Sequence, residues 1–155
     1  MPSVETMNPW TALAIVAGLI IVATVIGLVA RARTGRVQIV TGLRYVTAAD
    51  IDTDQRFGAV ATLIQFSTDM CSRCPGTKAL LKRAAESRSG VAYIEVDLTH
   101  RSDIATSFNI LQTPTTLVLD NSGAIAVRIG GAPRSEAVHT ALDIAQRRDH
   151  GQYVI

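Results

Sequence analysis

The sequence is poor in cysteine, in charge and in aromatic residues. Only two of its 155 residues are cysteines, charged residues make up 18% of the chain, and aromatic residues make up 5%. A structural zinc site needs four ligands. The two cysteines could be completed only by His100, His139 and His150, which fall in a loop, a predicted helix and the C-terminal tail. We therefore expect no metal site.

The chain also lacks a cationic region of the size that binds nucleic acid. It has 15 Lys+Arg and 13 Asp+Glu, for a net charge of +2. Beyond Arg44 there are 11 basic and 12 acidic residues, so most of the chain is nearly neutral. Nucleic-acid-binding domains carry a clear basic patch or stripe. We predict no nucleic-acid partner.

One stretch lacks charge altogether. Residues 10–30, WTALAIVAGLIIVATVIGLVA, contain only Thr11 and Thr24 as polar residues. As a helix, at about 1.5 Å per residue, this stretch crosses a hydrocarbon core of about 30 Å. A cleaved signal peptide is the alternative, but it begins with a positive region, and residues 1–9 have Glu5 and no Lys or Arg. We predict a transmembrane helix that anchors the protein in the lipid bilayer.

Three arginines, Arg31, Arg33 and Arg36, follow the apolar stretch directly. Cationic flanks of a transmembrane helix tend to stay in the cytoplasm, and they attract anionic lipid headgroups at short range. This pattern predicts a single-pass membrane protein with its N-terminus outside and its globular domain in the cytoplasm.

Beyond this flank the hydrophobic pattern predicts an α/β domain. Residues 59–67 form an apolar run of strand length, and residues 91–97 alternate between the two faces of a strand. Residues 77–88 carry apolar side chains at helical spacing. The other predicted elements are short strands at 37–40 and 43–46, a short helix or loop at 48–55, a helix at 101–110, strands at 115–120 and 124–130, and a helix at 134–148. From residue 59 onward the predicted order is β-α-β-α-β-β-α.

The two cysteines, Cys71 and Cys74, form a C-x-x-C motif between the strand at 59–67 and the helix that follows. Alone, such a pair is half of a zinc site, a structural disulfide or a redox dithiol. A loop this short gives little entropic stabilisation, which disfavours a purely structural disulfide. At a helix N-terminus, the positive end of the dipole should lower the pKa of the Cys71 thiol. Cys74 lies further into the helix, so we expect it to be the more buried thiol.

This order of elements, with C-x-x-C between a buried strand and a long helix, resembles the thioredoxin family. Pro114, in 110-ILQTPTTLVL-119, stands where the family has a cis-proline facing the dithiol, and Gly130 falls where the family has a glycine after the last strand. The similarity covers roughly residues 57–146. The whole chain is most similar to the membrane-anchored thioredoxin-like proteins of actinobacteria. The resemblance implies a thioredoxin-like fold, a mixed central sheet flanked by helices, preceded here by one transmembrane helix.

The predicted organisation has five parts. They are a short N-terminal segment (1–9), the transmembrane helix (10–30), a basic juxtamembrane linker (31–47), the thioredoxin-like domain (48–148) and a C-terminal tail (149–155).

The resemblance also implies a thiol–disulfide oxidoreductase that needs no cofactor. It assigns Cys71 as the attacking nucleophile and Cys74 as the resolving thiol, joined as a disulfide in the oxidised form. It assigns Met70, Thr113 and Pro114 to substrate binding.

The sequence departs from the family at positions near the dithiol. The usual W-C-G-P-C is M-C-S-R-C at 70–74, Gln65 replaces a buried Asp, and Glu95 replaces the Lys that partners it. We expect Arg73, Gln65 and Glu95 to tune the redox chemistry. Gln65 cannot take a proton, so we hypothesise that Glu95 acts as the base. Arg73 either favours the Cys71 thiolate or selects acidic partners.

These features predict a membrane-tethered enzyme that reduces or exchanges protein disulfides and that takes electrons from, or gives them to, a membrane partner. One alternative places the domain outside the membrane, as an oxidase, isomerase or reductase of exported proteins. A second alternative is a non-catalytic accessory module that uses the fold to bind a membrane partner.

Overall fold

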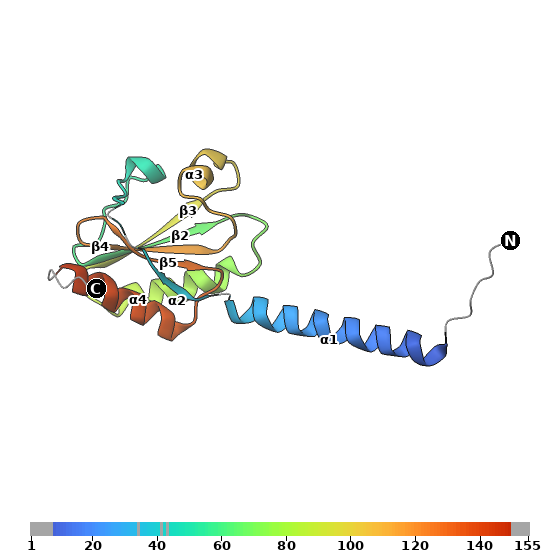
Figure 1. Ribbon diagram of the computed structural model, residues 1–155. Coiled ribbons are helices and arrows are strands. Elements are labelled where there is room, and N and C mark those ends of the chain that lie inside the picture. Colours follow the sequence, from blue (N-terminus) through green and yellow to red (C-terminus); the bar gives the residue numbers. More distant parts are fainter. Residues whose placement is uncertain (1–7, 34, 41, 43, 150–155) are drawn as a thin grey trace. The chain divides into compact units, whose positions relative to one another are not determined.

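The computed structural model describes residues 8–33, 35–40, 42 and 44–149 (Figure 1). It divides into two compact units, residues 1–34 and residues 35–155. The expectations for Leu43, His150 and the tail beyond residue 149 lie outside the described residues.

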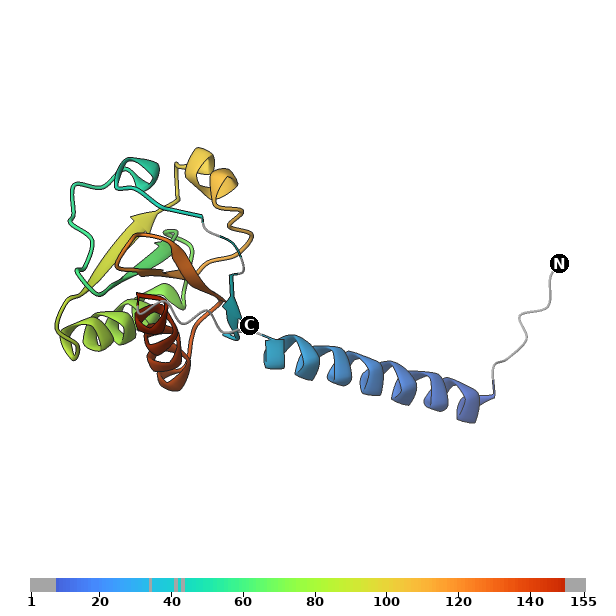
Figure 2. The ribbon, with the colours of Figure 1, turned by 60° about the vertical axis from the view of Figure 1, so that its left-hand side comes forward.

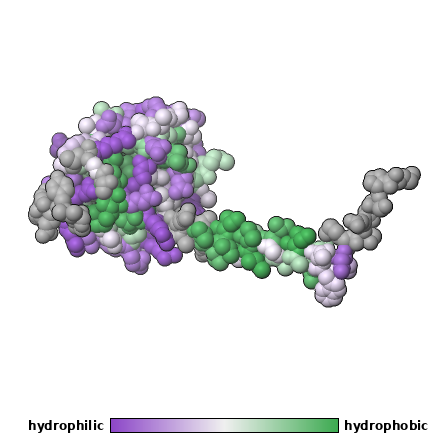
Figure 3. Space-filling view, in the orientation of Figure 1, coloured by the Kyte–Doolittle hydropathy of each residue, from purple (hydrophilic) through white to green (hydrophobic). Residues whose placement is uncertain are grey.

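The first unit is one helix, α1 (Pro9–Arg33). The side chain of Asn8 accepts a hydrogen bond from the backbone N–H of Trp10 at 3.2 Å, and Pro9 occupies the first helical position. Residues Pro9–Val29 have a mean hydropathy of 2.9, and Figure 3 shows their apolar surface in green. The helix is long and apolar enough to cross a membrane, a test that a signal sequence near an N-terminus also passes.

The second unit is built on a five-stranded sheet with the strand order β1-β5-β4-β2-β3. Its strands are β1 (Val37–Ile39), β2 (Ala61–Ser67), β3 (Val91–Asp97), β4 (Thr115–Asp120) and β5 (Ile125–Gly130). Its helices are the 3-10 turn η1 (Ala49–Ile51) and the α-helices α2 (Cys74–Glu86), α3 (Ser102–Ser107) and α4 (Ser135–Asp149). Strands β2 and β3 are parallel, and every other pair is antiparallel. The predicted mixed sheet and the predicted order of elements are confirmed.

Helices cover both faces of this sheet, α2 and α4 on one face and α3 with η1 on the other (Figure 2). The alternation along β2 explains the two cores: Leu63 packs toward α2 and α4, whereas Ile64 and Phe66 pack toward α3. Gln65 lies on the α2 side of β2, and it is fully buried. Ser67 on β2 and Thr116, opposite Gln65 on β4, are buried polar residues of the same face.

Several element boundaries differ from the sequence-based expectations; α3, for example, ends at Ser107 rather than at residue 110. Helix α2 begins at Cys74, so the C-x-x-C motif starts the helix as expected, and Pro75 fits the first turn, where a backbone N–H has no intrahelical partner. The segment predicted as a strand at 43–46 contributes only an isolated bridge between Tyr45 and Ala124. Strand β1, at one edge of the sheet, pairs with β5.

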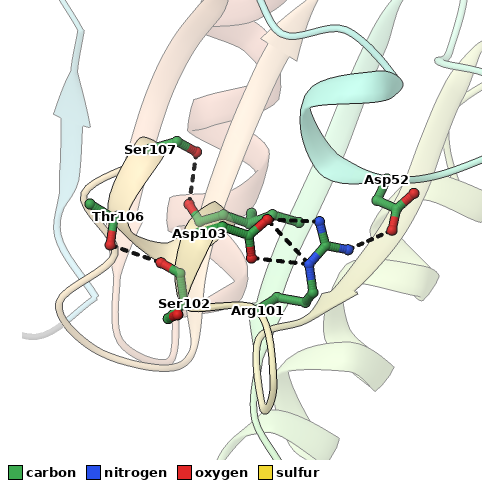
Figure 4. Close-up of polar contacts among 7 residues, drawn as sticks. Asp52, Arg101, Ser102, Asp103, Thr106 and Ser107 are labelled. Atoms are coloured by element: carbon green, nitrogen blue, oxygen red, sulfur yellow. Dashed lines mark hydrogen bonds and ion pairs between the residues drawn. The ribbon is translucent and has the colours of Figure 1, made fainter.

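Arg101 links α3 to η1 (Figure 4). Its guanidinium pairs with Asp103 at 2.9 Å and with Asp52, next to η1, at 2.5 Å. Hydrogen bonds to Asp103 and then to Asp52 raise the pKa of Arg101 above its usual value. The two short elements on this face are thus held together by an exposed ion-pair cluster.

The C-terminal end of α3 is held by two further arginines. Arg128 of β5 donates to the carbonyl oxygens of Phe108 at 2.5 Å and Asn109 at 3.1 Å. Arg44 donates to the carbonyl oxygen of Ser107, and its guanidinium lies 5.0 Å from the centre of the Phe108 ring. Burial, and then the charge of Arg44, lower the pKa of Arg128. These contacts satisfy the last carbonyls of α3 and fix the start of the loop that leads to Pro114.

Candidate functional site

The two cysteines lie between the end of β2 and the start of α2. Cys71 and Cys74 form a disulfide with an S–S distance of 2.07 Å. The Cys71 N–H donates to the Thr68 carbonyl at 3.0 Å, and the Cys74 N–H donates to the Cys71 carbonyl at 3.2 Å, so a tight turn presents the pair. Cys71 is partly exposed, whereas Cys74 is only 5% exposed. Cys71 is therefore the sulfur that an incoming molecule reaches first.

The start of α2 refines the expectation for Cys71. Cys74 is the first helical residue and Arg73 is the N-cap, so Cys71 lies in the turn that precedes the helix. Arg73 makes no side-chain cap; the Cys74 N–H instead donates to the Cys71 carbonyl, and Pro75 has no N–H to satisfy. The positive end of the helix dipole still lies beside Cys71.

A second loop is tied to this turn. The Thr113–Pro114 peptide bond is cis, as predicted. The hydroxyls of Thr113 and Thr68 are hydrogen-bonded at 3.1 Å, and Thr68 also accepts the Cys71 N–H. On the other side, the Gly131 N–H donates to the Pro114 carbonyl at 2.8 Å. The predicted site residues Cys71, Thr113 and Pro114 are thus brought together.

Two large apolar side chains near these loops are exposed to solvent. Met70, directly before Cys71, is 94% exposed, and Leu111, two residues before Thr113, is 87% exposed. Met70 was predicted from the sequence as a site residue, and Leu111 was not. The signal for Leu111 was an apolar residue in a loop between a helix and a strand, where no periodicity places it in a core.

A neutral hydrogen-bonded chain lies beneath Cys74. The side chain of Gln65 donates from Nε2 to the Cys74 carbonyl at 3.1 Å and accepts from the Tyr93 hydroxyl at 2.9 Å. Burial, and then the charge of Glu95, raise the pKa of Tyr93, so this residue remains a donor. Gln65 therefore fixes the backbone of the resolving cysteine, and Tyr93 is a partner that the sequence analysis did not identify.

Glu95 occupies the solvent side of the same region. Its carboxylate accepts from Ser67 Oγ at 3.1 Å and pairs with Lys78 Nζ at 2.5 Å. The Lys78 side chain is 44% exposed, but its amine is paired. Glu95, Lys78 and both cysteines line one open cleft of about 600 Å³. Its other lining residues are Gln55, Ser67, Thr68, Asp69, Pro75 and Asp97.

Arg73 does not line the cleft that contains Glu95 and Lys78. Its side chain is exposed and lines a second hollow, of about 250 Å³, between α2 and the loop that leads to α4. The other residues of this hollow are Ser72, Gly76, Thr77, Leu80, Ala132 and Pro133. Neither cysteine lines it, so the dithiol has an acidic and polar cleft on one side and a largely apolar hollow with a cation on the other.

Across the described ranges, no group of three or more His, Cys, Asp or Glu residues is placed to hold a metal ion.

Comparisons with known proteins agree on one family. A family model described as Thioredoxin matches residues 46–143. Thioredoxin C-2 of Corynebacterium nephridii is 29% identical over 91 residues, which cover 54% of this chain and 84% of that protein. A thioredoxin of Mycoplasma genitalium is 26% identical over 76 residues, 49% of this chain and 74% of that protein.

Solved structures of thioredoxins also match. Mitochondrial thioredoxin 3 of Saccharomyces cerevisiae, in its oxidised form, is 20% identical with a TM-score of 0.48, over 54% of this chain and 76% of that one. The thioredoxin of Fasciola hepatica is 15% identical with a TM-score of 0.48, over 56% of this chain and 81% of that one.

Proposed function

Because this chain belongs to the thioredoxin family and is a thiol–disulfide oxidoreductase, we propose that it works as a membrane-tethered reductase of protein disulfides. The observation that carries the proposal is the Cys71–Cys74 pair at the start of α2, with Cys71 partly exposed and Cys74 buried. In the reduced protein, the Cys71 thiol is accessible to a client disulfide, and the Cys74 thiol is shielded from solvent.

The reaction runs in two exchanges. The Cys71 thiolate attacks one sulfur of the client disulfide, and the other client sulfur leaves as a thiolate that takes up a proton. Cys74 then loses its proton and attacks the Cys71 sulfur, which releases the second client thiol and forms the Cys71–Cys74 disulfide. The client disulfide gains two electrons and two protons; the enzyme gives up the two electrons and the Cys74 proton, and solvent supplies the second proton.

The second exchange requires an acceptor for the Cys74 proton. Gln65 is not ionisable, and it already binds the Cys74 carbonyl. Glu95 lines the same open cleft as Cys74, and its carboxylate pairs with Lys78. In the proposal Glu95 accepts the proton by way of water in the cleft, while Gln65 holds the Cys74 backbone in place.

Client binding is assigned to the surface around Cys71. Met70 offers an exposed apolar side chain, and the loop of Thr113 and Pro114 is hydrogen-bonded to the Cys71 turn. An extended client segment would lie along this loop with its disulfide facing Cys71.

The direction of electron flow depends on the compartment. Arg31, Arg33 and Arg36 follow the apolar stretch, and the positive-inside tendency favours a cytoplasmic domain. In that compartment the dithiol would be kept reduced, and its electrons would pass to protein disulfides or to a membrane partner. With the domain outside, the same dithiol would oxidise, isomerise or reduce exported proteins.

An insulin-reduction assay on the full chain in detergent, with dithiothreitol as electron source, tests the catalytic proposal. Wild-type protein should accelerate the precipitation of insulin chains, and Cys71→Ser should be inactive. In the absence of dithiothreitol, reduced Cys74→Ser should trap a mixed disulfide with insulin, because no second thiol resolves it. If wild type and Cys71→Ser match the uncatalysed rate, the chain is a non-catalytic accessory module.

Labelling with a membrane-impermeant maleimide tests the topology. In intact cells treated with a permeant reductant, Cys71 of a cytoplasmic domain should be labelled only after lysis. Labelling before lysis places the domain outside.

The proton role of Glu95 is tested by Glu95→Gln, which keeps the shape of the side chain. Rapid mixing should show normal formation of the mixed disulfide and slower resolution. Glu86→Gln serves as the charge control, because Glu86 is a carboxylate of α2 that lines neither the cleft nor the hollow. An unchanged resolution rate in Glu95→Gln removes the base from the mechanism.

A further inference from the structure

The hollow beside Arg73 has the features of a recognition site for the residues that flank the reactive cysteine of a client. It lies between the first turns of α2 and the loop before α4, and its lining includes Leu80, Ala132 and Pro133. Its volume of about 250 Å³ corresponds to several waters at about 30 Å³ each, which is room for one large side chain. The hollow adjoins the dithiol without containing either sulfur.

Arg73 supplies an uncommitted charge at the rim of this hollow. It stands between the two cysteines in sequence, and its side chain is exposed. Its carbonyl oxygen accepts from Thr77, but its guanidinium has no hydrogen bond or ion pair within the described residues. By contrast, Lys78, one turn further along α2, is paired with Glu95. A free cation next to a reactive cysteine is available to an anionic group of the client.

Gly76 keeps the hollow open. It faces the same space, and a Cβ placed on it would meet nothing within 4 Å. Glycine lowers helix stability relative to alanine, so no local stability requirement explains it at this position. Its small size leaves room for an incoming side chain.

From these observations we propose that Arg73 and the hollow formed by Gly76, Leu80, Ala132 and Pro133 select clients with an acidic residue and a large apolar residue beside the reactive cysteine. The apolar side chain enters the hollow, and the carboxylate pairs with Arg73. The inference rests on the proposed reductase function and adds the substrate class. Of the two roles open for Arg73 it assigns client selection, because Arg73 lines the hollow and not the cleft that both cysteines line.

The test uses reduced full-length protein in detergent and peptides with one intrachain disulfide. Two peptides carry a leucine beside one cysteine and differ only in an adjacent Glu or Lys. A third replaces the leucine of the Glu peptide with alanine. Stopped-flow mixing gives a second-order rate constant for a single turnover, so no electron donor is needed.

Wild type should reduce the Glu peptide about three- to five-fold faster than the Lys peptide, as expected for one exposed ion pair. Added salt should shrink this ratio. Arg73→Gln should bring the ratio to one, and Arg73→Glu should invert it. Lys82→Gln, which removes an exposed cation of α2 outside the hollow, should leave the ratio unchanged. Gly76→Leu should slow the leucine peptide to the rate of the alanine peptide.

The outcomes separate the two proposals. If wild type reduces none of the peptides, the reductase function fails, and this inference fails with it. If wild type reduces the Glu and Lys peptides equally, the recognition site is absent while the function stands. If Arg73→Gln slows both peptides by the same factor and raises the measured pKa of Cys71, Arg73 acts on the thiolate, and the inference is overturned.

Discussion

The hydrogen bond from Tyr93 to Gln65 should make a measurable contribution to stability. Gln65 is fully buried, and within the described residues the Tyr93 hydroxyl is the donor to its Oε1, at 2.9 Å. Tyr93→Phe removes that donor and keeps the ring. A lost bond that leaves a buried acceptor unsatisfied costs about 1–3 kcal/mol. The packing of β2 against β3 should otherwise be unaffected.

Urea unfolding of the oxidised protein, with α1 in detergent micelles, measures this cost by circular dichroism. A domain of this size is expected to unfold in one cooperative step. A loss of about 2 kcal/mol with an m value of about 2 kcal/mol/M lowers the midpoint by about 1 M. The m value itself should not change, because the same surface is exposed.

Thr116 provides the matched control. It lies opposite Gln65 on β4, and its buried hydroxyl has no hydrogen-bond partner within the described residues. Thr116→Val therefore removes a hydroxyl from the same region without breaking a bond, and the midpoint should stay the same or rise. If Tyr93→Phe behaves like Thr116→Val, the chain from Tyr93 to the Cys74 backbone is not a source of stability, and the role given to Gln65 is wrong.

Three further substitutions test other parts of the fold by the same unfolding measurement. In Gly58→Ala the new Cβ would lie 2.2 Å from the Ala61 carbonyl oxygen, so a loss of about 3 kcal/mol is expected because backbone must move; a stable variant would contradict the close approach. Gly76→Ala, where a Cβ meets nothing, should gain up to about 1 kcal/mol from helix propensity. Hydrogen bonds from Thr47 lower the pKa of Asp50, so the stability that Asp50 adds is complete above the usual Asp range and is lost as the pH falls through the lowered value. The difference between wild type and Asp50→Asn should therefore be a few tenths of a kcal/mol at neutral pH and disappear in acid; a difference that persists at low pH would refute this.

The sheet could be predicted from the sequence because its signals are local. Residues 91–97 alternate, and β3 has those bounds. The apolar run at 59–67 reads as a strand buried on both faces, and β2 is buried along its whole length. The C-x-x-C motif and Pro114 then placed the dithiol and the facing loop, because both lie next to predicted strands.

The contacts around the dithiol could not be predicted in the same way. The β2–β3 register places Tyr93 opposite Leu63 and Glu95 opposite Gln65. Tyr93 is therefore a diagonal neighbour of Gln65 on the same face, and only this register brings its hydroxyl to the Gln65 side chain. Helical periodicity does not show that the Lys78 amine reaches Glu95 on β3. The exposure of Leu111 depends on the course of a loop, for which no periodic signal exists. These features come from tertiary geometry rather than from local pattern.

The loop between α3 and β4 offers a route to engineering. Its base is held by Arg44 and Arg128, which bind the last carbonyls of α3 from two other segments of the domain. Its far end is held by the hydrogen bond between Thr113 and Thr68, whereas Leu111 in between contributes almost nothing to the core. A foreign sequence grafted between these two fixed points would change the surface offered to clients while leaving the dithiol and the sheet intact, so libraries of thiol–disulfide oxidoreductases with different clients can be built by varying this tip alone.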